Sequence, residues 1–150
     1  MVPGFEQYDV KVLLLLAKAI DGEKTDYFKW LAQNNYKELA AFCNMLQDDV
    51  EAEQWLTQNG HQWLGIVSHA IDGADGCNKS ATCGTTPRQW LLHNMHPANL
   101  MFALACRGEE RAVYWLKKQQ LDILIILANS VSALRKKQEL DTAFPYKMRF

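Results

Sequence analysis

A Trp-Leu pair occurs four times in the chain, as Trp30-Leu31, Trp55-Leu56, Trp90-Leu91 and Trp115-Leu116. Successive pairs are separated by 25, 35 and 25 residues. A period between about 20 and 50 residues is typical of proteins built from stacked repeats, in which each unit covers the apolar face of the next. The pairs therefore predict four copies of one structural unit rather than a sequence without internal order.

Further positions keep the same spacing from each tryptophan. Four residues after it the side chain is a carboxamide, in Asn34, Asn59, Asn94 and Gln119. Nine residues after it stand Leu39, Leu64, Asn99 and Leu124, so the third copy departs there and moves its apolar residue to Leu100. Thirteen residues after it the side chain is small, in Cys43, Ser68, Ala103 and Ala128. This agreement over several positions strengthens the prediction of a repeat.

Each unit is expected to contain two short helices. In the second copy Ala52, Trp55 and Leu56 have the spacing of one helix face. Asn59-Gly60 then predicts a helix end, because both residues tolerate the left-handed backbone found there. Helices of about ten residues are marginal alone in water and persist by packing on neighbours. We therefore expect the four Trp-Leu pairs to lie in the core between units.

The chain is predicted to be all-α, a stack of short antiparallel helix pairs without a substantial sheet. Its 150 residues correspond to one domain. The expected parts are a capping helix over 5–21, units near 23–47, 48–73, 86–108 and 109–134, and a tail over 135–150. Ala19-Ile20-Asp21-Gly22 at the end of the capping helix matches Ala70-Ile71-Asp72-Gly73 in the second unit, although no Trp-Leu pair precedes it.

Part of the chain resembles the ankyrin repeat. The residues that carry the resemblance lie between Gly60 and Leu104, and they are Gly60-His61, Ile66-Val67, Gly73-Ala74-Asp75, Gly84-Thr85-Thr86-Pro87 and the inter-helix His96. Thr86 as N-cap and Pro87 at the first helical position form a favoured helix start. The remaining units repeat every 25 residues and lack the projecting hairpin, so a generic α-solenoid of helix pairs is the alternative architecture.

The resemblance implies a non-catalytic module that binds a protein partner through loops and outward faces of the first helices. The expected contact residues on the long loop are Asp75, Asn78, Lys79 and Thr82. On the first helices they are Lys29, Gln33, Gln54, Gln58, Arg88, His93, Arg111 and Lys118. Because the loop interrupts an otherwise regular array, it is the favoured binding element.

Composition narrows the class of partner and the compartment. The formal charge of −1 argues against a nucleic-acid partner, although residues 1–60 are acidic and residues 61–150 are basic. The apolar stretch 121–134 is shorter than the roughly 20 residues of a membrane span and contains Asp122, so no membrane partner is expected. Four cysteines without an export signal predict free thiols in the cytoplasm.

A zinc site is the main chemical alternative. Cys77, Cys83, His93 and His96 lie close together in sequence, and zinc accepts two cysteines and two histidines. Their spacings do not match the usual zinc finger, so no metal or other cofactor is expected. The chain also lacks a glycine-rich phosphate loop, a nucleophile elbow and a His-Glu-x-x-His motif, and no group of catalytic residues was identified.

Overall fold

The computed structural model describes residues 2–22, 25–47, 49–72 and 86–143. Within these residues a short 3-10 turn, η1 (Phe5–Gln7), precedes nine α-helices. These are α1 (Val10–Asp21), α2 (Thr25–Gln33), α3 (Lys37–Met45), α4 (Val50–Gln58), α5 (Gln62–Ile71), α6 (Pro87–Asn94), α7 (Pro97–Cys106), α8 (Glu110–Lys118) and α9 (Asp122–Ala143). The only β pairing among them is an isolated bridge between Val2 and Met95. The prediction of an all-α fold is confirmed.

Each Trp-Leu pair lies among the last five residues of a first helix, α2, α4, α6 or α8, and a short turn leads to the second helix. In the second copy the His61 amide donates to the Leu56 carbonyl at 2.8 Å. The Asn59 side chain donates to the Trp55 carbonyl at 2.7 Å. Gly60 between them has φ +80°, in the left-handed region. The Trp55 carbonyl also accepts from the Asn59 backbone amide at 3.0 Å, so this side chain adds a second bond at the helix end, as Asn34 and Asn94 do in their copies.

The two members of each pair are buried to different degrees. Leu31, Leu56, Leu91 and Leu116 are fully buried. Trp55, Trp90 and Trp115 are partly buried, and Trp30 is 40% exposed. The Trp30 ring stacks on Tyr36 and the Trp55 ring stacks on His61, in each case the residue six positions later. The leucines thus supply the core, whereas these two tryptophan rings cover the turn between the paired helices.

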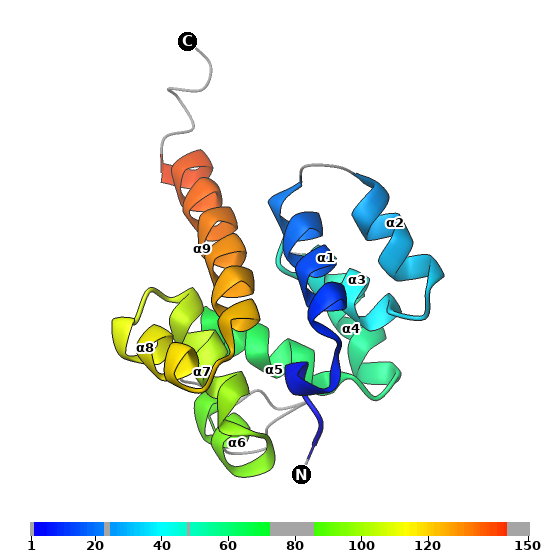
Figure 1. Cartoon of the computed structure of the whole chain (residues 1–150). Helices are drawn as coiled ribbons and strands as arrows, with labels where there is room; N and C mark the ends of the chain where they lie inside the picture. Colours follow the sequence, from blue (N-terminus) through cyan, green and yellow to red (C-terminus); the bar gives the residue numbers. More distant parts are fainter. Residues whose placement is uncertain (1, 23–24, 48, 73–85, 144–150) are drawn as a thin grey trace.

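The second helices form the inside of the molecule, and the first helices lie outside them. Among the inner helices α3 contacts α5, α5 contacts α7 and α7 contacts α9. Helix α1 contacts α3 on one side and packs along α9 on the other, so the two ends of the array meet (Figure 1). The closing helix α9 extends through the first part of the expected tail to Ala143. Its cover on one side is α1.

The N-terminal turn η1 anchors the start of the chain inside this array. Phe5 is fully buried, with its ring 5.8 Å from Phe42 in α3, 5.0 Å from Trp63 in α5 and 4.8 Å from Phe102 in α7. Its amide donates to the Asn99 side chain at 3.0 Å. Because Asn99 is fully buried, this bond compensates for its removal from water. The third copy therefore has Asn99 where the other copies have leucine because Asn99 bonds to the N-terminal segment that docks against α7.

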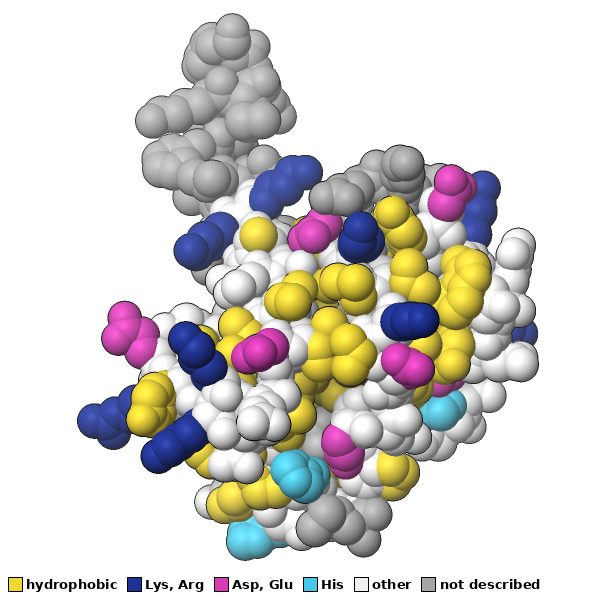
Figure 2. All heavy atoms as spheres, in the orientation of Figure 1, with side chains coloured by type: hydrophobic (Ala, Val, Ile, Leu, Met, Phe, Trp, Pro, Cys, Tyr) yellow, Lys and Arg dark blue, Asp and Glu magenta, His cyan; other side chains and the backbone are white. Residues whose placement is uncertain are grey.

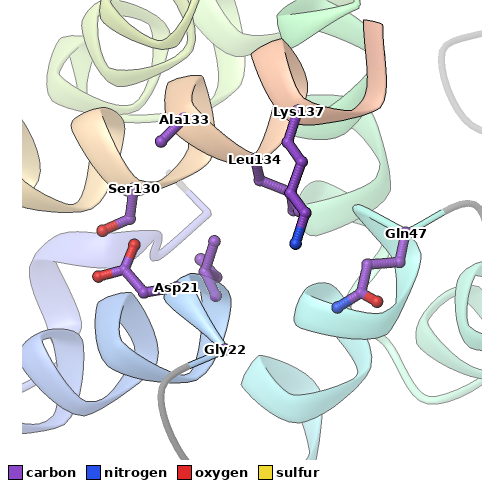
Figure 3. Close-up of a pocket in the computed structure, with 8 residues that line it drawn as sticks. Asp21, Gly22, Gln47, Ser130, Ala133, Leu134 and Lys137 are labelled. Atoms are coloured by element: carbon purple, nitrogen blue, oxygen red, sulfur yellow. The ribbon is translucent and has the colours of Figure 1, made fainter. Parts of the chain in front are cut away.

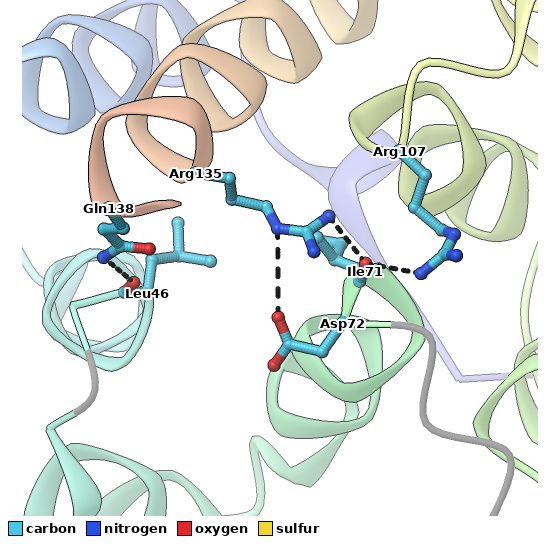
Figure 4. Close-up of polar contacts among 6 residues, drawn as sticks. All are labelled: Leu46, Ile71, Asp72, Arg107, Arg135 and Gln138. Atoms are coloured by element: carbon cyan, nitrogen blue, oxygen red, sulfur yellow. Dashed lines mark hydrogen bonds and ion pairs between the residues drawn. The ribbon is translucent and has the colours of Figure 1, made fainter. Parts of the chain in front are cut away.

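Helix α9 is held across the C-terminal ends of α3 and α5 (Figure 4). Gln138 donates to the Leu46 carbonyl at 2.9 Å. Arg135 and Arg107 both donate to the Ile71 carbonyl, at 2.8 and 3.1 Å. These cationic donors pair with a carbonyl at a helix C-terminus, where the helix dipole also favours positive charge. The contacts fix the position of α9 and hence of the surface that it shares with α1.

The carboxamide cap can be tested in the second unit. Asn59→Ala removes the side-chain bond to the Trp55 carbonyl and keeps the backbone bond, and we expect the free energy of unfolding to fall by about 0.5–1 kcal/mol. Urea unfolding followed by circular dichroism measures the change. Gln58→Ala, at the neighbouring exposed position, serves as the control and should stay within about 0.5 kcal/mol of the wild type. Equal losses for both variants would contradict the assigned role of Asn59.

The two arginines on Ile71 provide a second test. Because each guanidinium alone can still pair with the carbonyl, Arg135→Ala and Arg107→Ala should each lower unfolding free energy by about 1–2 kcal/mol. The double variant should lose more than the sum of the single losses, since it leaves the carbonyl without either donor. Chemical denaturation of all three variants measures this coupling. Strict additivity would show that the arginines do not share the carbonyl.

Candidate interaction surface

The predicted contact residues divide into two groups. Asp75, Asn78, Lys79 and Thr82, together with the thiols of Cys77 and Cys83, lie outside the described residues. Of the first-helix residues, those that are exposed are Lys29, Gln33, Gln54, Gln58, His93, Arg111 and Lys118. Arg88 is partly buried, and its Nε atom is buried without a hydrogen-bond partner among the described residues.

The exposed first-helix residues do not form one continuous face. Each first helix packs against two inner helices: α2 against α1 and α3, α4 against α3 and α5, α6 against α5 and α7, and α8 against α7 and α9. The four first helices are therefore spread around the outside of the molecule, with α2 and α8 on opposite sides (Figure 1). A single partner would reach one or two of these helices at a time.

A different surface gathers exposed apolar side chains, along the contact between α1 and α9. Val10 and Leu14 lie one turn apart on α1 and are 60% and 39% exposed. Ile126 and Ala133 lie on one face of α9, and Ile126 is 45% exposed. We name this surface the α1–α9 seam and define it by Val10, Leu14, Ile126 and Ala133. No described helix covers it on the outer side (Figure 1).

The apolar character of the seam differs from that of the rest of the described surface. The other large exposed hydrophobic residues occur singly, one on each first helix, as Trp30, Val50, Leu92 and Tyr114. Figure 2 shows hydrophobic side chains gathered over the middle of the face that α1, α2 and α9 present. Scattered exposed apolar residues are normal on a folded protein, whereas an adjoining group marks a candidate binding surface.

A polar hollow of about 230 Å³ lies at the C-terminal end of the seam. It is lined by Asp21 and Gly22 of α1, Ser130 and Lys137 of α9, and Gln47 after α3. The Ser130 hydroxyl and the Asp21 carboxylate point toward one another, and the Lys137 amino group lies across the opening from them (Figure 3). The seam thus leads from an apolar stripe to a site that presents both a carboxylate and an ammonium group.

Two other hollows and the remaining ionisable groups have fewer features of a binding site than the seam. A hollow between α4 and α5 contains His69 and Glu53, whose side chains are 2.7 Å apart and partly exposed. A wider hollow over the first two units has an alanine-rich floor beside Trp55. Burial, the proximity of the Glu38 carboxylate and their 3.1 Å hydrogen bond raise the pKa of Tyr8. These side chains belong to helix contacts and form no recognisable catalytic arrangement.

The described cysteines are buried thiols. Burial raises the pKa of Cys43 to about 11 and raises the pKa of Cys106 further, so both are protonated at neutral pH. His96 is committed to the start of α7, where its Nδ1 atom accepts a bond from the Ala98 amide at 3.1 Å. Among the described residues no group of three or more His, Cys, Asp or Glu side chains is placed to hold a metal ion.

Sequence reasoning did not identify the α1–α9 seam. The nearest signal was the match between the end of α1 and the end of α5, which marks α1 as a second-type helix without a preceding first helix. Placing the exposed side of α1 beside α9 requires the closure of the array, which the repeat alone does not specify.

Comparisons with known protein families, with curated proteins and with solved structures give no match for this chain. Across the described residues, no helix combines the length and apolar character needed to cross a membrane. Function is therefore inferred from the chain's own repeat and from the surface that its helices leave uncovered.

Proposed function

We propose that this chain is a non-catalytic helical-repeat module that binds a protein partner in the cytoplasm. Its four helix pairs are divergent copies of an ankyrin-like unit, three of which have lost the projecting hairpin. The ankyrin-like residues between Gly60 and Leu104 and the shared turn structure of the units support this interpretation. Binding, rather than chemistry on a small substrate, is the function that such arrays perform.

The observation that carries the proposal is the α1–α9 seam, over which no described helix packs. Asp21 and Ala133 line one hollow, and the exposed Leu14 and Ile126 each stand seven residues before them on the same helix faces, so apolar surface adjoins across the two helices. Covering such a surface removes apolar area from water and contributes roughly 25 cal/mol for each Å². The polar hollow at one end adds groups that fix the orientation of a partner. We therefore place the principal contact at the seam.

Affinity purification with seam variants tests this function. Wild-type protein is immobilised beside Leu14→Asp and Ile126→Lys, and proteins retained from an extract of the expressing cell are quantified by mass spectrometry. A charge placed in the seam should reduce retention of the partner at least tenfold, because it must be desolvated on binding. Leu92→Asp, at an exposed leucine on α6, is the matched control and should retain the partner fully.

Circular dichroism of each variant excludes unfolding as the cause of lost binding. Retention that is unchanged by both seam substitutions would contradict the placement of the contact. If retention also survived deletion of 76–83 and substitution of the predicted first-helix residues, the proposal of a protein-binding module through these surfaces would be rejected.

A further inference from the structure

Helix α1 occupies the place of a second helix in an incomplete unit. Its C-terminal sequence Ala19-Ile20-Asp21-Gly22 repeats that of α5, Ala70-Ile71-Asp72-Gly73. It also packs against the inner helices α3 and α9, as the other second helices pack against their inner neighbours. No described helix before α1 corresponds to α2, α4, α6 or α8. Within the described residues, α1 is therefore an inner helix without an outer partner of its own.

The other units show where the missing first helix would lie. Each first helix packs in the angle between its own second helix and the preceding inner helix, as α4 does between α5 and α3. Because the array closes, the inner helix that precedes α1 is α9. The corresponding place is the outer side of the α1–α9 contact, where Val10, Leu14 and Ile126 are exposed.

We infer that the α1–α9 seam binds an amphipathic helix of the partner protein, which takes the place of a first helix for α1. This inference rests on the proposed function and specifies the form of the partner. A bound helix of about nine residues would match α2, α4 and α8 in length. Apolar residues at positions i and i+4, as in Ala52 and Leu56 of α4, would face the seam.

Charges at the two ends of the seam determine the direction of the bound helix. Helices α1 and α9 run in the same direction (Figure 1). At their N-terminal ends the exposed charges are Asp9 and Asp122 against Lys11, which leaves an excess of negative charge. At the other end the described side chains are Lys18, Lys136 and Lys137 against Asp21, which leaves an excess of positive charge. An antiparallel helix with acidic residues first and basic residues last complements this arrangement and also aligns its dipole favourably.

The chain itself contains a helix with this pattern. Helix α8 has Glu110 in its first turn and Lys117 and Lys118 in its last turn, and it buries Ala112 and Leu116. A synthetic peptide of residues 109–120, EERAVYWLKKQQ, is therefore a suitable probe. A hydrocarbon staple between the exposed positions 114 and 118 would hold it helical and leave Lys117 as the basic residue of its last turn, since so short a helix is marginal alone.

Fluorescence anisotropy of the labelled stapled peptide with the full chain tests the inference. We expect saturable binding to the wild type and to Leu92→Asp, and at least tenfold weaker binding to Leu14→Asp and to Ile126→Lys. Binding that is absent from the wild type, or equal in all four proteins, would overturn the inference. If the peptide fails this test but seam substitutions still abolish retention of the cellular partner, the proposed function stands and only the helical form of the partner is rejected.

A charge exchange tests the direction of the bound helix. Asp122→Lys should weaken binding of the parent peptide several-fold, because Lys117 of the peptide would meet like charge. The peptide with Lys117→Glu should bind Asp122→Lys more tightly than it binds the wild type. Lack of this reciprocal preference would contradict the antiparallel placement. Sedimentation of the wild type and of Leu14→Asp tests whether a second copy of the chain, and not a partner helix, covers the seam. A wild-type dimer that becomes a monomer in Leu14→Asp would overturn the inference, whereas we expect both proteins to sediment as monomers.

Discussion

The burial of Phe5 between three inner helices is the contact on which this architecture depends. The ring packs against Phe42, Trp63 and Phe102, which belong to the inner helices α3, α5 and α7. Gly4, immediately before it, lies so close to Asn99 that an added Cβ would fall 2.3 Å from the side-chain oxygen. With the N-terminus held in this way, α1 starts where it can pack along α9. The helix pairs thereby form a closed arrangement in which α1 packs against α9.

The contact between α1 and α9 determines how the two ends of the array are covered. In an open stack the two ends need separate polar caps, and each unit contacts its neighbours alone. Here α1 and α9 cover one another, and the polar contacts of Arg135 and Gln138 fix α9 across two inner helices. Among the described elements the outer layer has one helix fewer than the inner layer, because no described first helix pairs with α1. The exposed apolar residues of the seam follow from this mismatch between five inner helices and four outer ones among the described elements.

Much of the local structure could be predicted from the sequence, because its causes are local. Asn59 and Gly60 mark a helix end through backbone preference and a hydrogen bond four residues back, and the structure has both. The sequence predicts the tryptophans in the core, and Trp55, Trp90 and Trp115 pack against it, whereas Trp30 is 40% exposed. Trp30 and Trp55 also stack on the turn residues Tyr36 and His61, a placement that depends on side-chain directions the spacing does not encode. The sequence shows that Asn99 departs from the leucine of the other copies but does not show why. The reason is its hydrogen bond to the amide of Phe5, 94 residues earlier in the chain.

Closure of the array by α1 and α9 is the central claim, and native-state hydrogen exchange tests it most directly. In a closed arrangement the end helices open only when the whole domain unfolds, so amides of Leu16 in α1 and Leu127 in α9 should match Ile66 in α5 in their protection. An open stack would fray from its ends. Much faster exchange of α1 and α9 than of α5 would contradict the account.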